Sequence, residues 1–165
     1  MPEKQTIERA KKAKHKGKSA GTQSGEFVRE EMHHIREGKH GARSTKQAIA
    51  IGLSKARRAG VALPPPKRGR VSEKTRRSAE RAYESGRKGK SRVSARRSRA
   101  TGGALKRERR AAASRQALSR QARSAAGRRS RTERSAAARR AVRTKGRAGR
   151  SAAARKAARA RARRV

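Results

Sequence analysis

The chain has 165 residues, of which 52 are Lys or Arg and 11 are Glu, with no Asp, so its formal net charge is +41. Most of its hydrophobic residues are alanines, and it holds one Phe, one Tyr and no Trp. A chain this charged and this poor in large apolar side chains is not expected to bury a core of ordinary size. Because it has no Cys, disulfides, thiolate metal sites and Cys nucleophiles are excluded.

The positive charge is concentrated after residue 66. Residues 67–165 carry 37 Lys and Arg against five Glu, a net charge of +32, whereas residues 1–66 carry +9. Such a segment needs a polyanion as counter-charge, and nucleic acid is the most abundant one. The predicted fold class is mainly α and largely disordered: a small helical hairpin followed by a basic low-complexity tail with partial helix.

The first segment, residues 1–22, is predicted to be a mobile basic arm. A polar helix can form over residues 3–18, since Pro2 suits the first turn of a helix. Ile7 and Ala10 alone would give this helix an apolar stripe.

Residues 23–63 are predicted to form a helical hairpin domain. Its first helix is expected to begin with Ser24 as N-cap and to end at Gly38. Ser44 and Gln47 have the spacing of a capping box, which opens the second helix.

The second helix is expected to close at Gly60 in a left-handed conformation, with Val61 packing back on Ala56. A hairpin of this size is near the limit for independent folding. The N-terminal arm, self-association with a second copy, or a bound partner would each complete it. The predicted hairpin core consists of Phe27, Val28, Met32, Ile35, Ile49 and Leu53.

Residues 64–66 are three prolines, predicted to form a stiff spacer at the domain boundary. One further helix is predicted over residues 72–85, stopped by Gly86. The whole of residues 67–165 is predicted to be a basic, disordered or partly helical tail. Its Ala and Arg favour helix, but like charges three and four residues apart repel, so helix is expected to form on binding phosphates.

The Lys and Arg of the tail are expected to bind phosphates collectively. Arg68 and Arg70 flank Gly69 in an arrangement that resembles the AT-hook of minor-groove binders, with Val71 where that motif has a second Pro. Minor-groove insertion and plain phosphate contact both stay open. The predicted nucleic-acid-binding residues are Lys67, Arg68, Arg70, Arg128, Arg129, Arg139, Arg140, Arg155, Lys156, Arg159, Arg161, Arg163 and Arg164.

A group of polar residues in the hairpin has the composition of a metal-ligand set. Its members are Glu30, Glu31, His33, His34, Glu37 and His40. The Glu30-x-x-His33 spacing resembles carboxylate-bridged metal sites, but those need matching pairs from other helices. The group is therefore interpreted as a solvated helix face, with no metal and no other cofactor. Without Asp, Cys or a Gly-rich phosphate loop, catalysis and a small-molecule substrate are not expected.

Two resemblances accompany these patterns. Residues 25–66 resemble a small bacterial domain family of unknown function, most clearly in the stretch Ser-x-Lys-Gln-Ala-Ile-Ala-Ile-x-Leu-Ser-x-Ala-Arg at residues 44–57. The resemblance implies no particular activity. The tail is similar in composition to the tails of linker histones and bacterial histone-like proteins, which implies DNA compaction.

The predicted function is non-enzymatic, largely sequence-independent binding and compaction of duplex DNA, histone-like and nucleoid-associated in the cytoplasm. An RNA- or ribosome-associated basic protein remains an alternative, although the chain lacks aromatics for a base-stacking platform. A further alternative is an adaptor whose hairpin docks a protein while the tail localises it to nucleic acid. An exposed apolar patch of Phe27, Ile35, Ile49 and Leu53 would favour the adaptor. No apolar run is long enough to span a membrane, so no membrane partner is expected.

Overall fold

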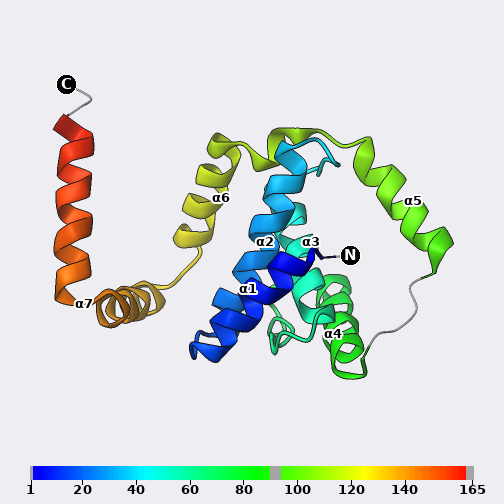
Figure 1. The fold of residues 1–165 in the computed structure, drawn as a ribbon, viewed down its shortest axis with the longest axis horizontal. Helices are drawn as coiled ribbons and strands as arrows, with labels where there is room; N and C mark the ends of the chain where they lie inside the picture. Colours follow the sequence, from blue (N-terminus) through cyan, green and yellow to red (C-terminus); the bar gives the residue numbers. More distant parts are fainter. Residues whose placement is uncertain (1, 90–93, 163–165) are drawn as a thin grey trace. The chain divides into compact units, whose positions relative to one another are not determined.

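A computed structural model describes residues 2–89 and 94–162, and every regular element in these ranges is helical (Figure 1). The elements are α1 (Lys4–His15), α2 (Ala20–Arg36), α3 (Thr45–Arg58), α4 (Glu73–Arg87), α5 (Ala95–Lys106), the 3-10 helix η1 (Arg110–Ala113), α6 (Arg115–Gly127) and α7 (Arg131–Ala162). The chain divides into two units, Met1–Gln121 and Ala122–Val165. None of the helices in the described ranges combines the length and apolarity that a membrane span requires.

The prediction of a largely disordered chain is wrong. Helices occupy most of the described part of residues 67–162. Ala and Arg are among the residues with the highest intrinsic helix propensity, and a helix satisfies its backbone groups within one segment. The charged side chains stay in water, where their mutual repulsion costs only a few tenths of a kcal/mol per pair.

The predicted hairpin is present as α2 and α3, which pack against each other. Phe27, Met32 and Ile35 are buried as predicted. Val28 and Ile49 are half-buried against the same cluster as Met32. Leu53 is half-buried as well. The core prediction is therefore correct in position, although only three of its six members are fully enclosed.

The predicted start of the first hairpin helix is wrong. α2 begins at Ala20, with Ser19 as N-cap accepting a hydrogen bond from the backbone N–H of Thr22 at 3.3 Å. Ser24 lies inside the helix, fully buried, and its hydroxyl donates to the carbonyl of Ala20 at 2.7 Å. A serine whose hydroxyl is satisfied by the preceding turn can stay within a helix instead of starting one.

The two ends of α3 agree with the prediction. The hydroxyl of Ser44 accepts a hydrogen bond from the backbone N–H of Gln47 at 3.2 Å, and the Gln47 side chain reaches back to the preceding loop. Gly60 closes the helix with φ +85°, and the N–H of Val61 donates to the carbonyl of Ala56 at 3.1 Å. Val61 and Ala56 share one apolar cluster.

The segment 1–22 is not a mobile arm, because α1 packs along α2. Ala10 is 5% exposed and joins Phe27 in an apolar cluster, with Ile7 packed beside it. Arg9 forms an ion pair with Glu26 of α2 at 3.1 Å. The short apolar stripe of α1 suffices because α2 offers a matching apolar surface.

The prolines at residues 64–66 do not separate a folded part from a tail. α4, which follows them, packs against α3 and continues through Gly86 to Arg87. Gly86 is needed there, because a Cβ at this position would collide with the carbonyl of Arg57. Arg57 is itself buried and donates to the carbonyls of Leu63 and Pro64 at 3.1 and 3.3 Å, which ties the proline segment to α3.

The tail also returns to the hairpin at residues 105–113. In the loop between α2 and α3, the N–H of Gly41 donates to Leu105 at 2.8 Å and that of Ala42 to Arg109 at 3.1 Å. A Cβ on Gly41 would collide with the backbone of Glu108. This loop and this part of the tail are therefore in backbone contact.

Alanines of η1 complete the hairpin core. Ala112 and Ala113 are 7% and 1% exposed and belong to one cluster with Met32 and Ile35. The hydroxyl of Thr45 donates to the carbonyl of Ala112 at 2.7 Å. The core of the first unit thus draws on residues from both sides of the proline segment.

α7 belongs to the second unit and has a different character. No side chain described for it is buried. The helix is kinked at Gly146, where φ is +62° and ψ is −179°, and two helical segments continue on either side. The described side chains of α7 therefore form no buried core.

Candidate functional site

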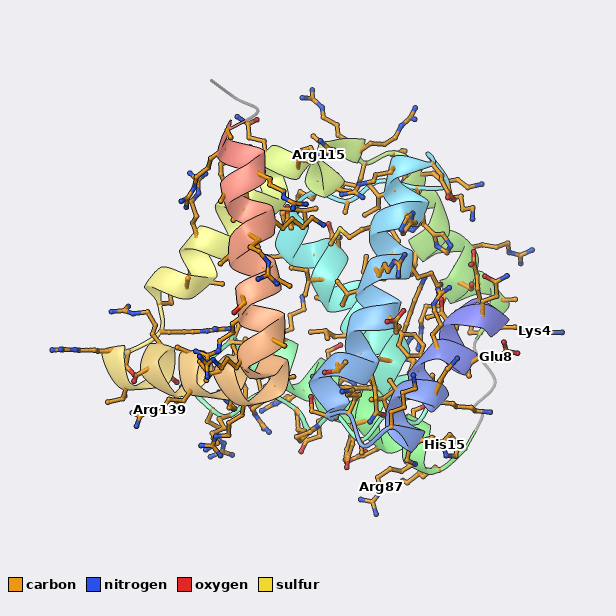
Figure 2. The ribbon with its side chains drawn as sticks, turned by 60° about the vertical axis from the view of Figure 1, so that its left-hand side comes forward. Lys4, Glu8, His15, Arg87, Arg115 and Arg139 are labelled. Carbon is orange, nitrogen blue, oxygen red and sulfur yellow. The ribbon has the colours of Figure 1, made fainter. Side chains whose placement is uncertain are left out.

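The first candidate site is the cationic surface of α7. Residues 131–162 hold 12 Lys and Arg against one Glu. All arginines of the helix are exposed, and Figure 2 shows Arg139 extending from the ribbon into solvent. Arg131 and Arg140 are nine residues apart, which is two and a half helical turns, so they point to opposite sides. The helix therefore offers positive charge all around its axis.

The predicted binding residues fall at three places in the structure. Lys67, Arg68 and Arg70 are exposed on a turn between α3 and α4, at which Gly69 has φ +78°. The connection between α6 and α7 carries Arg128 and Arg129. The residues on α7 are Arg139, Arg140, Arg155, Lys156, Arg159 and Arg161, all of them exposed. Arg163 and Arg164 lie outside the described residues.

α4 is also rich in arginine, but two of its arginines, Arg76 and Arg77, are paired with carboxylates of the same helix. Arg76 contacts Glu73 at 2.7 Å and Glu80 at 3.3 Å, and Arg77 contacts Glu73 at 3.4 Å. The hydrogen bond from Arg76 lowers the pKa of the Glu73 carboxyl to about 2. A polyanion would have to compete with these carboxylates, so α4 is a poorer binding surface than α7.

A second constellation lies between α2, the following loop and α3. The interpretation of this helix face as solvated is wrong for Glu30 and Glu31, which are 3% and 0% exposed. His33 and Glu37 are exposed as expected. The carboxylates can be buried because Lys55 of α3 lies 2.7 Å from Glu31 Oε2 and 3.6 Å from Glu30 Oε1.

Two histidines approach the same buried carboxylate. His40 Nε2 lies 3.1 Å from Glu31 Oε1, and the two rings, His34 and His40, are edge to face with centroids 6.1 Å apart. One ligand atom from each of Glu31, His34 and His40 lies within 4.8 Å of the others. His34 Nε2 in turn lies 2.8 Å from Glu3 Oε1. The sequence pattern indicated Glu31, His34 and His40 as a possible ligand set, but it did not predict that they lie close together. Their proximity depends on the loop after α2 and on the N-terminal segment.

Glu3 connects this cluster to the start of the chain. Its backbone N–H donates to Glu30 Oε2 at 3.2 Å, and its carboxylate accepts from His34 and from Lys39. The hydrogen bonds from His34 and Lys39 lower the pKa of the Glu3 carboxyl. The first turn of α1 is therefore held over the cluster by polar contacts.

A model of a family of unknown function, DUF6496, matches residues 4–68. The matched residues run from α1 to just beyond α3, and so cover the α1–α3 core and the buried carboxylates. This confirms the expected similarity to a small domain family of unknown function, and it extends the similarity toward the N-terminus. Neither the curated proteins nor the solved structures gave a match.

Proposed function

We propose that this protein is a non-enzymatic, nucleoid-associated DNA-binding protein that binds and compacts duplex DNA with little sequence preference. The observation that carries the proposal is α7, a 32-residue helix with 12 cations, one Glu and no buried side chain described. A helix that is polar all round has no core to pack on, so its arginines lie exposed at the surface, where a polyanion can reach them. Phosphates bound by Lys and Arg release counterions, and this supplies sequence-independent affinity.

Compaction is supported by the placement of the cations around α7. Because Arg131 and Arg140 point to opposite sides, the phosphates of two duplexes can be neutralised by one helix at the same time. The kink at Gly146 gives two helical segments that can follow different duplexes. Bridging of neighbouring duplexes condenses DNA without any base contact.

The adaptor alternative loses its main support. The apolar patch that would favour protein docking includes Phe27 and Ile35, which are 1% and 0% exposed. Ile49 and Leu53, the other two members, are half-buried. The hairpin therefore uses these residues for its own core.

The test removes the same number of cations from two regions of the chain. One full-length variant replaces six cations of α7 by Gln: Arg139, Arg140, Arg155, Lys156, Arg159 and Arg161. The matched control replaces six lysines of the N-terminal region: Lys4, Lys11, Lys12, Lys14, Lys16 and Lys18. Both variants lose six charges. We expect the α7 variant to bind duplex DNA far more weakly than the control. We also expect it to condense DNA less than the control does, which light scattering measures.

Structured RNA is measured in parallel, because the same phosphates are present there. Equal affinity of the two variants for DNA would contradict the assignment to α7. Condensation of RNA by the wild type at concentrations that leave duplex DNA dispersed would replace DNA with RNA as the partner.

A further inference from the structure

We propose that Glu31, His34 and His40 bind a divalent transition-metal ion of the zinc class, which fastens the loop after α2 to the helix. Glu31 and His34 are three residues apart, so they project from one face of α2. His40 comes from the loop, and the ligand atoms of the three lie within 4.8 Å of one another. Carboxylate oxygen and imidazole nitrogen are ligands that zinc accepts.

The hydrogen bonding of His40 supports a cation at this place. Its Nδ1 lies 3.0 Å from the carbonyl oxygen of Gly41, which can only accept, so Nδ1 carries the hydrogen. In a neutral ring Nε2 then presents a lone pair toward Glu31 Oε1 at 3.1 Å. Two acceptors facing each other are unfavourable unless a positive ion lies between them. Metal-binding histidines characteristically donate their other ring N–H to a carbonyl or carboxylate in this way.

The charge of the cluster leaves room for a cation. Glu30 and Glu31 bury two negative charges, and Lys55 supplies one positive charge at Glu31 Oε2. Oε1, on the other side of the same carboxylate, faces the histidines. Both Glu31 oxygens lie at ion-pair distance from a nitrogen, yet neither accepts a well-directed hydrogen bond within the described residues. Lys55 approaches only one oxygen of this carboxylate, and a coordinated ion would compensate the negative charge at the other oxygen.

The surroundings of His34 and His40 also suit a metal site. Glu3 accepts a hydrogen bond from His34 Nε2 at 2.8 Å, which orients that ring. Tetrahedral zinc ligands lie about 3.4 Å apart. His40 Nε2 is already 3.1 Å from Glu31 Oε1, so His34 is the ring that has to close in on the other two ligands. Both rings are at the edge of the core, with side chains 12% and 15% exposed, and can rotate.

The site also has a structural consequence for the tail. The loop that His40 belongs to donates the N–H groups of Gly41 and Ala42 to the carbonyls of Leu105 and Arg109. An ion that holds His40 to α2 would hold this loop, and with it the docking of residues 105–113.

The experiment titrates ZnCl2 into the full-length chain after removal of metals with a chelator. The wild type should bind a single equivalent by calorimetry, and amide exchange at Gly41 and Ala42 should slow. Changing His40→Ala or His34→Ala should weaken binding by more than about 100-fold, since even outer partners of metal ligands cost 10–100-fold. His33→Ala is the matched control, exposed and adjacent on α2, and should bind as the wild type does.

Three results would overturn the proposal. One is the absence of saturable zinc binding by the wild type. Another is equal loss of binding in His33→Ala and His40→Ala. The last is a His40 ring that NMR shows to be an imidazolium at neutral pH and that stays protonated when zinc is added. The charge of Glu31 would then be balanced by His40 without a metal ion. Circular dichroism of each metal-free variant separates loss of a ligand from loss of the fold.

Discussion

At Gly52 the backbones of α2 and α3 lie close together. A Cβ at this position would lie 2.7 Å from the backbone Cα of Val28, and backbone cannot move aside as a flexible side chain can. We therefore expect Gly52→Ala to lower the free energy of unfolding by about 1–3 kcal/mol, the usual cost of overpacking. Thermal unfolding followed by circular dichroism measures the change.

Gly25→Ala provides the matched control in the partner helix. A Cβ at Gly25 would meet no heavy atom within 4 Å, and the residue lies inside α2. Since Ala is a better helix former than Gly, this variant should gain about 0.5–1 kcal/mol. A Gly52→Ala variant as stable as Gly25→Ala would show that the two helices are not in backbone contact at this point.

At the residue scale, the features that could be predicted from the sequence are those that depend only on residues adjacent along the chain. The cap at Ser44 and the left-handed Gly60 depend on a few consecutive residues, and both are correct. The burial of Glu31 was not predictable in this way, because it depends on Lys55 arriving from another helix and His40 from a loop. Taken alone, Glu is among the residues least often buried, so its burial has no local signal.

The docking of η1 on the hairpin is the element-scale feature with the clearest consequence. Ala113 is 1% exposed in the cluster formed with Met32 and Ile35, whereas Ala111 is exposed. Ala113→Asp should destabilise the first unit, because a carboxylate without a partner would enter the apolar cluster. Ala111→Asp, with the same change of charge, should leave the melting temperature nearly unchanged. If both variants melt alike, residues 105–113 are not part of the core.

The start of α4 is expected to depend on pH. The pKa of Glu73 is lowered to about 2, mainly by the hydrogen bond from Arg76. A lowered pKa means that the contribution to stability is complete above the ordinary value of 4.5 and is lost as the pH falls toward about 2.

An NMR titration of the Glu73 side chain measures this directly. In the wild type the midpoint should lie near 2, and in Arg76→Gln it should rise toward 4.5. Arg87→Gln removes an exposed arginine from the other end of the helix and should leave the midpoint where it is. A wild-type midpoint near 4.5 would mean that the Arg76–Glu73 hydrogen bond is not populated.

The packing of helices was predictable where they carry large apolar side chains at helical spacing. α2 and α3 have such a stripe, and they were found. α1 and η1 contribute mainly alanine to the core, and an alanine in a basic, alanine-rich segment does not indicate by itself whether it is buried. Their packing depends on the surface that α2 and α3 offer, which a local pattern does not contain.

At the scale of the whole molecule, the composition indicated the high charge correctly but gave the wrong degree of order. Low hydrophobicity and high net charge usually prevent a chain from folding. Here the first unit folds on a small, alanine-rich core assembled from α1 to α4 and η1, and α7 is helical through local propensity. The division of charge was predictable, and it underlies the proposed function.

The dependence of DNA affinity on salt tests the central claim most directly. For binding by phosphate neutralisation, the logarithm of affinity falls linearly with the logarithm of salt concentration, with a slope of about −0.9 per phosphate engaged. We predict a steep slope for the wild type, similar for A·T-rich and G·C-rich duplexes. The variant that lacks six α7 cations should have a slope shallower by about five. A shallow slope in both proteins, together with strong discrimination between the duplexes, would show that base contacts carry the affinity and would contradict the account.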